Sequence, residues 1–209
     1  MMQVEAFVRC KEFPCQELAH AGYSVPAVEV DPEAVRMILI AEAPPIESAE
    51  RLYAGPGALH GETTLEAFRD AGLDVPTAEA LLAEGIYLTT AVKCAKQEYT
   101  IRATPIRHCS HLLEQELALF PNVGAYLLMG DVAIRGFNEI ARRTTGKRVI
   151  PAGSIYRMRK ATYRYGDARV YPSYLQAGKA FYIETSKREM IAEDLRSALA
   201  WLEEKNKRG

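Results

Sequence analysis

A membrane-spanning segment is the first feature that this sequence lacks. No apolar run among the 209 residues approaches the roughly 18 that a transmembrane helix needs. The first residues also lack the charged and apolar regions of a secretory signal peptide. Sustained heptads and long exposed apolar stripes are absent as well. We therefore expect a soluble, cytoplasmic protein that is monomeric and has no membrane partner.

A large net charge is the second missing feature. The formal net charge is -1, so no overall positive field draws the chain onto nucleic acid. The composition is 48% hydrophobic and 25% charged, as in ordinary globular proteins, without repeats or low-complexity segments. We expect one domain over residues 1–209, with a cysteine-bearing N-terminal segment (about 1–30) packed on it.

Basic side chains nevertheless gather between residues 141 and 170. Asp167 is the one acid in this stretch, against nine basic residues: Arg142, Arg143, Lys147, Arg148, Arg157, Arg159, Lys160, Arg164 and Arg169. Tyrosines are interleaved with them at Tyr156, Tyr163, Tyr165 and Tyr171. The pattern has two interpretations, a solvated face or a surface that binds phosphates and stacks bases.

Apolar runs and amphipathic stretches alternate along the chain. They predict strands at 37–41, 86–92, 123–129 and around 170, and helices at 62–72, 105–120, 131–143 and from 186 onward. Residues 153–172 predict a hairpin. Alternation of this kind indicates an α/β fold, a three-layer α/β/α sandwich around a mostly parallel central sheet. Ligands of such sheets bind beyond the carboxyl ends of the strands.

The first core strand, "MILIA", runs directly into Glu42, Pro44 and Pro45, and a loop rich in Pro, Gly and Ala continues to Gly61. Two interpretations remain open. In the first, the prolines simply end the strand beside a solvated carboxylate. In the second, they stiffen a functional loop that holds Glu42 in one arrangement.

Four cysteines are present: Cys10, Cys15, Cys94 and Cys109. Disulfides are not expected in the cytosol, so the thiols are either scattered core residues or ligands of a metal site. Four thiolates suit an iron–sulfur cluster or tetrahedral zinc, and their spacing does not choose between them.

Several stretches in order resemble the uracil-DNA glycosylase superfamily, and most closely its iron–sulfur branch (family 4). They are "ILIAEAPP", "YAGPGALHGETTLEAFRDAGL", "YLTTAVKC", "CSHLLEQELALFPNVGAYLLMGDVA", "VYPSYL" and "SKREMIAEDLRSALAWL". "ILIAEAPP" resembles the family's strand ending in Gly-Glu-Ala-Pro-Gly, and "VYPSYL" stands where the family has His-Pro-Ser. The resemblance covers nearly the whole chain.

The resemblance implies a DNA repair hydrolase that flips a deaminated or damaged base, uracil or a relative, out of DNA and cleaves its N-glycosidic bond. It implies a [4Fe–4S] cluster on Cys10, Cys15, Cys94 and Cys109, with zinc as the alternative. Within the site it implies catalytic roles for Glu42, which positions water, and Tyr171. It also implies base-binding roles, which fall on Ala43, Tyr53, Thr90 and Ser173.

The resemblance also implies contacts with DNA outside the base site. Leu175 lies in the loop that wedges into the duplex in that superfamily, and a buried leucine packing the last helix is the alternative. Lys179 and the basic hairpin, represented by Arg157, Arg159 and Lys160, are expected to grip phosphates.

The sequence departs from the family pattern in three ways, at four positions. Thr90 replaces the asparagine that reads the base edge, Tyr171 replaces the histidine, and Ala41 and Pro45 replace flanking glycines. A hydroxyl offers one rotating group where an amide offers a donor and an acceptor in a fixed plane. The sequence therefore carries a second hypothesis, a catalytically diverged relative that binds nucleic acid without cutting. A third is a zinc-binding α/β domain acting on a small ligand.

Overall fold

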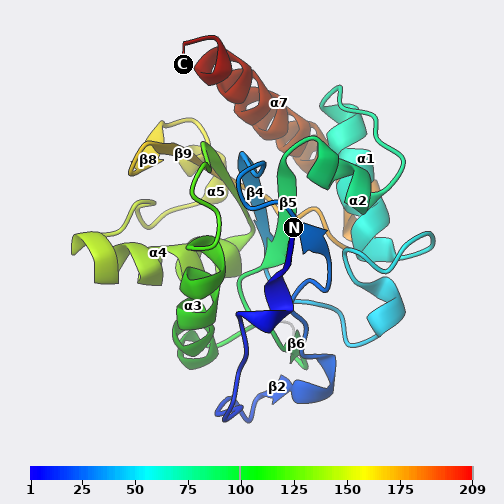
Figure 1. Ribbon diagram of the computed structural model, residues 1–209, viewed down its shortest axis with the longest axis vertical. Coiled ribbons are helices and arrows are strands. Elements are labelled where there is room, and N and C mark those ends of the chain that lie inside the picture. The colour runs from blue at the N-terminus through cyan, green and yellow to red at the C-terminus, as the bar shows by residue number, and fades with distance from the viewer. Residues whose placement is uncertain (99, 209) are drawn as a thin grey trace.

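The fold is an α/β/α sandwich around a five-stranded sheet (Figure 1). The computed structural model describes residues 1–98 and 100–208. The sheet has the strand order β5-β4-β7-β9-β8. Its strands are β4 (Met37–Ala41), β5 (Ile86–Thr90), β7 (Ala125–Met129), β8 (Tyr163–Tyr165) and β9 (Ala168–Ser173). All neighbouring pairs are parallel except β8 with β9, so the predicted fold class is confirmed.

Helices cover both faces of this sheet. Figure 1 shows α3 (Ala103–Leu117) and α4 (Asp131–Thr145) on one side. On the other side lie α1 (Leu59–Asp70), α2 (Ala78–Ala83) and α7 (Thr185–Arg208). The short helices α5 (Ile155–Met158) and α6 (Ala180–Ile183) lie in the connections before and after the β8–β9 hairpin. The hairpin predicted over 153–172 is present only in the second part of that range, as β8 and β9, because Ile155–Met158 forms α5. Helix α2 is one that the sequence pattern did not predict.

Strand β4 is buried on both faces, as its continuous apolar run predicts. Side chains alternate between faces along a strand. Ile38 and Ile40 therefore join the core beneath α3 and α4, while Met37 and Leu39 join the core beneath α1 and α7. The sheet thus separates two halves of the core.

The N-terminal segment adds two small antiparallel pairs at the edge of this sandwich. Strand β1 (Met2–Gln3) pairs with β3 (Glu29–Val30), and β2 (Leu18–Ala19) pairs with β6 (Ala95–Lys96). Val4, Val8, Leu18 and Val25 are buried in the same core as α3 and α4. The segment is thus packed on the sheet. None of the helices among the described residues is long and apolar enough to cross a membrane.

Candidate functional site

Glu42 directly follows β4, and the strands that come next in the chain lie on opposite sides of β4, with β5 on one side and β7 on the other. The direction in which strands are added to the sheet therefore reverses at this point. Such a reversal opens a crevice at the carboxyl ends of the strands. The Glu42 carboxylate reaches the N-terminus of α4, where its Oε1 accepts a hydrogen bond of 3.3 Å from the Val132 amide. The sheet and the helix together hold this carboxylate in place.

Gly130 makes the position of Glu42 possible. Its φ is +94°, a conformation that L-residues rarely adopt, and a Cβ there would lie 2.5 Å from Glu42 Oε1. The single glycine between β7 and α4 thus serves both the turn and the close approach of the carboxylate.

The pKa of Glu42 is raised, chiefly because the carboxyl is buried. The amide hydrogen bond from Val132 and the positive charge of Lys96 act in the opposite direction, and Asp131 adds to the rise. A carboxylate with a raised pKa is a better proton acceptor. Glu42 is therefore suited to take a proton from water beside a substrate.

Two cavities meet next to Glu42. The Glu42 cavity, of about 470 Å³, is lined by Glu42, Ala43, Leu59, Lys96 and Leu175 among others. The Tyr53 cavity, of about 590 Å³, is lined by Arg51, Tyr53, Thr89 and Thr90 together with the N-terminal residues 3–9 and 23–27. Pro44, Pro45 and His60 line both. The volumes are in the range of sites that hold a small molecule or nucleotide.

The hydroxyl groups in the Tyr53 cavity already have partners within the chain. Tyr53 Oη accepts a hydrogen bond of 2.8 Å from the Leu88 amide, and Thr90 Oγ1 donates one of 2.9 Å to the Val92 carbonyl. Strand β5 is at the edge of the sheet, so the Tyr53 hydroxyl pairs with an edge amide. Thr90 can still accept a hydrogen bond, but its donor is taken.

Tyr171 and Ser173 lie apart from these cavities. Tyr171 is buried with Leu127 and Leu195 beneath α7, and its hydroxyl donates to the Ser197 carbonyl at 3.3 Å. Ser173 is fully buried, and its hydroxyl donates to Asp194 Oδ2 at 2.6 Å. Neither residue lines the Glu42 or the Tyr53 cavity. The structure thus brings together Glu42, Ala43, Tyr53 and Thr90, and not these two.

The residues expected to contact DNA differ in their surroundings. Leu175 lines the Glu42 cavity and packs partly on the core beneath α7. Lys179, Arg157 and Lys160 are exposed, and Lys160 stands 4.3 Å from the centre of the Tyr156 ring.

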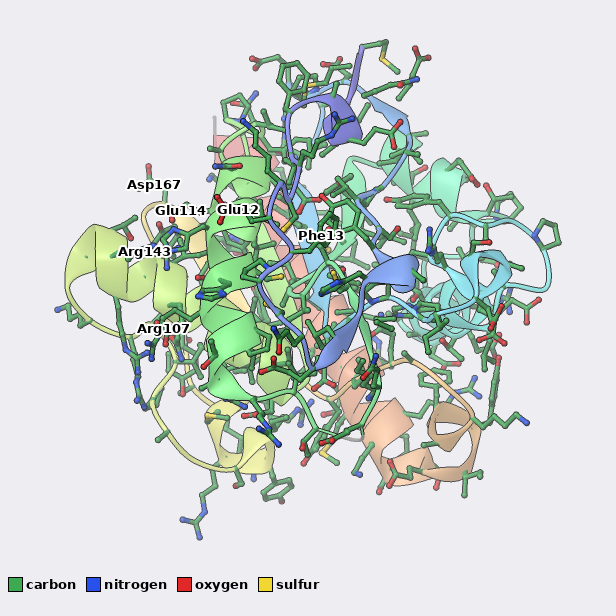
Figure 2. All side chains as sticks on the ribbon, turned by 90° about the horizontal axis from the view of Figure 1, so that it is seen from below. Glu12, Phe13, Arg107, Glu114, Arg143 and Asp167 are labelled. Carbon is green, nitrogen blue, oxygen red and sulfur yellow. The ribbon has the colours of Figure 1, made fainter. Side chains whose placement is uncertain are left out.

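Arg159 is largely buried and paired with two acids of α7, Asp194 at 2.8 Å and Glu193 at 2.9 Å. Other basic residues are also paired; Figure 2 shows Arg143 beside Glu114, to which it donates two hydrogen bonds. The positive charge of the stretch 141–170 is therefore partly compensated by acids from elsewhere in the chain.

The four cysteines line a third cavity, of about 660 Å³, which we call the thiol cavity. The pairing of β2 with β6 explains how they meet, because Cys15 precedes one strand and Cys94 precedes the other. In Figure 2 the loop that carries Glu12 and Phe13 passes in front of α3, the helix that contributes Cys109. All four thiols are free.

The loop between Cys10 and Cys15 is held by its aromatic neighbours. Phe13 has a positive φ of 45° and packs against the rings of His20 and Tyr23. The Cys10 amide donates to Tyr23 Oη at 3.0 Å. The wide spacing of the two cysteines is thus accommodated by a defined loop.

Burial and mutual repulsion disfavour the thiolate forms. The pKa of Cys15 is raised to about 11 and that of Cys94 to about 12, in both cases mainly by burial and further by neighbouring thiols. In the part of the chain that is described, no group of three or more His, Cys, Asp or Glu side chains could hold a metal ion. Four thiols around one cavity suit soft iron in their chemistry, although they are not gathered closely enough to hold a single ion.

A buried ion pair links the two regions, and sequence reasoning missed it. Lys93 and Glu116 are both fully buried and form a salt bridge. Lys93 Nζ also donates to Thr89 Oγ1 and the Thr90 carbonyl, while Tyr87 donates to Glu116 at 2.7 Å. A lysine inside the apolar run "TTAVKCA" is the signal that could have revealed it.

Sequence comparison finds a limited similarity to a known protein. Over 109 residues the chain is 31% identical to a type-5 uracil-DNA glycosylase of Thermus thermophilus. The match covers 50% of this chain and 49% of that protein, so it spans about half the length of each. No family model matches the sequence. The similarity supports the uracil-DNA glycosylase superfamily, whereas the iron–sulfur family 4 branch stays a prediction.

Proposed function

We propose that this protein is a DNA glycosylase that hydrolyses the N-glycosidic bond of a deaminated or damaged base, uracil or a relative, in DNA. The observation that carries the proposal is the junction of the Glu42 and Tyr53 cavities at the carboxyl ends of β4 and β5. The similarity to a uracil-DNA glycosylase points the same way.

The junction suits a substrate made of two parts. A base extruded from DNA would lie in the Tyr53 cavity beside Tyr53 and Thr90, and its sugar would lie in the Glu42 cavity. The bond between the two parts would then cross the junction at Pro44, Pro45 and His60. Leu175 in the wall of the Glu42 cavity would face the duplex from which the base comes.

The proposed reaction is a hydrolysis. The bond between the anomeric carbon and the base nitrogen breaks, and its electron pair leaves with the base. The oxygen of a water molecule bonds to the anomeric carbon and passes a proton to Glu42, and a proton returned to the base completes the products. Glu42 is placed for this role because burial raises its pKa and α4 fixes its orientation.

We further propose that Cys10, Cys15, Cys94 and Cys109 hold a [4Fe–4S] cluster in the thiol cavity. In such a cluster each thiolate binds a different iron, so the ligands stand farther apart than around a single ion. The cationic irons would offset the burial and repulsion that raise the pKa of Cys15 and Cys94. The cluster would tie the N-terminal segment to α3 and supply stability. Its chemistry takes no part in the hydrolysis.

A base-release assay tests the function directly. Protein purified without oxygen is incubated with single-stranded and mispaired oligonucleotides that contain uracil, hypoxanthine, xanthine or alkylated bases. We expect release of a free base and an alkali-labile strand with at least one of them, and about 10²-fold slower release by Glu42→Gln. No release from any member of the panel would overturn the enzymatic proposal.

The second candidate is a relative that binds nucleic acid without cutting it. It is favoured by the hydrogen bond from Thr90 Oγ1 to Val92, which occupies the donor at the position where the family reads the base. This candidate predicts salt-dependent DNA binding without alkali-labile product. Gain of uracil excision by Thr90→Asn would show that the rest of the site is competent.

A further inference from the structure

His60 lies at the junction of the two cavities, and neither its sequence context nor the family resemblance assigns it a role. It belongs to the first turn of α1 and is only 5% exposed. Its backbone carbonyl accepts hydrogen bonds from Thr63 and Thr64, which fix this turn. Its side chain lines both the Glu42 cavity and the Tyr53 cavity.

The imidazole of His60 has a buried nitrogen, Nε2, for which the described part of the chain offers no hydrogen-bond partner. This atom is closed to solvent. Burial lowers the pKa of His60 to about 4, so the ring is neutral at pH 7 and offers one donor and one acceptor. Leaving such an atom unsatisfied is unfavourable, and a ligand with a complementary group would recover this cost.

The other side chains around the junction either carry no donor or already have a hydrogen-bond partner. Pro44 and Pro45 have no N–H group. The Thr90 hydroxyl donates to Val92, and the Tyr53 oxygen accepts from the Leu88 amide. Among these side chains His60 Nε2 is the polar atom that has no hydrogen-bond partner within the described residues, a state that Arg51 Nε shares elsewhere in the Tyr53 cavity.

We propose that His60 contacts the extruded base, forming a hydrogen bond with a polar atom of the base edge next to the glycosidic bond. This inference rests on the glycosylase function proposed above. The ligand class is a heteroaromatic base with a carbonyl oxygen or ring nitrogen at that edge. A neutral donor that meets this edge gains strength as negative charge builds on the departing base, and so favours cleavage.

Excision by variants of His60 gives the first test. In single-turnover assays on the substrate that the wild type cleaves, we expect His60→Ala to be about 10²-fold slower. His60→Gln keeps a side-chain donor of similar reach, so it should recover part of that loss. His111→Gln is the matched control, because His111 is an exposed histidine on α3 and should behave as wild type.

Nitrogen-15 NMR of the histidine rings gives a test that does not depend on activity. The chain has four histidines, and comparison with His60→Gln assigns the His60 signals. The wild type is titrated with free uracil, hypoxanthine and xanthine at pH 7. We expect a saturable shift of a His60 ring nitrogen with the base that the enzyme releases. Because this measurement uses the wild type, it stands even if His60→Ala does not fold.

The two tests separate the failure of this inference from the failure of the proposed function. If the wild type excises a base while both His60 variants match it and no ring signal moves, the His60 contact is refuted and the glycosylase function stands. If no base is excised but a free base shifts His60, the contact stands without the enzymatic function. If neither excision nor a shift is found, both are refuted.

Discussion

The Lys93 ammonium and the Glu116 carboxylate form an ion pair with both side chains fully shielded from solvent. Lys93 follows β5, which borders the Tyr53 cavity, and Glu116 lies on α3, which carries Cys109. The Lys93 backbone amide also hydrogen-bonds the Cys109 sulfur, which opposes the rise in the pKa of that thiol caused by burial. The candidate base site and the thiol cavity are therefore joined by one polar network.

Removing one partner of this ion pair should be strongly destabilising. We expect Lys93→Met to lower the free energy of unfolding by about 3–5 kcal/mol, because Glu116 is left buried without its counter-charge. The double variant Lys93→Met/Glu116→Leu should recover most of this loss. Urea denaturation followed by circular dichroism measures both. A loss below about 1 kcal/mol in the single variant would show that the pair contributes little.

Gly130→Ala should disturb Glu42. The added Cβ would meet the carboxylate in a backbone conformation that only glycine adopts easily, at a cost of about 1–3 kcal/mol. We expect a matching loss of stability and slower base release. Gly146→Ala is the control, since Gly146 caps the end of α4 with φ +77° and the added atom would have no neighbour within 4 Å among the described residues. It should lose stability without affecting excision, and equal loss of excision in both variants would argue against steric displacement of Glu42.

Tyr171→Phe tests whether Tyr171 has the catalytic role that the family resemblance implies or only the packing role that its position beneath α7 indicates. The phenol donates to Ser197 beneath α7, so its removal should cost about 0.5–1.5 kcal/mol of stability. Base release should change less than about twofold. If Tyr171 instead contacts the base in the reacting complex, excision will fall by about 10²-fold in the same single-turnover assay.

Arg157 and Arg159 should respond differently to truncation although both lie in the basic stretch. Arg159→Ala leaves Asp194 buried without its guanidinium partner and should cost about 3 kcal/mol of stability. Arg157 is exposed, so Arg157→Ala should leave stability within about 0.5 kcal/mol. If Arg157 contacts a phosphate, the slope of log DNA affinity against log salt concentration should decrease in magnitude by about one in that variant. An unchanged slope would remove Arg157 from the DNA-binding surface.

The depressed pKa of His60 should appear in the pH dependence of stability. The unfolded chain binds a proton at His60 below about pH 6.5, whereas the folded protein resists it until about pH 4. The free energy of unfolding should therefore fall as the pH is lowered through this window, by about 2 kcal/mol between pH 7 and pH 5 from this residue. Urea denaturation of wild type and His60→Gln at both pH values measures the difference. An identical pH dependence in the two proteins would mean that His60 titrates normally.

Local sequence patterns determined most of the scaffold. The apolar run Met37–Ala41 predicts a strand covered on both faces, and that prediction is confirmed because such a run can be buried only between two layers. The amphipathic pattern predicts the helix from Asp131, and turn residues predict the hairpin that ends near Pro172. Both elements are present, although Gly130 and not Asp131 is the N-cap of the helix. The α/β/α class follows from the alternation of these elements. The position of Glu42 at a strand end was also readable from the sequence alone.

Tertiary structure decided which of these residues meet. Register and side-chain direction turn Tyr171 towards α7 and away from the junction, although it occupies the expected place in the chain. The same packing engages the Thr90 hydroxyl, pairs Arg159 with α7 and brings four distant thiols to one cavity. It also leaves His60 Nε2 without a partner among the described residues, between two cavities. Sequence patterns report local periodicity, whereas burial, pairing and cavity shape depend on contacts between segments far apart in the chain, which no local pattern encodes.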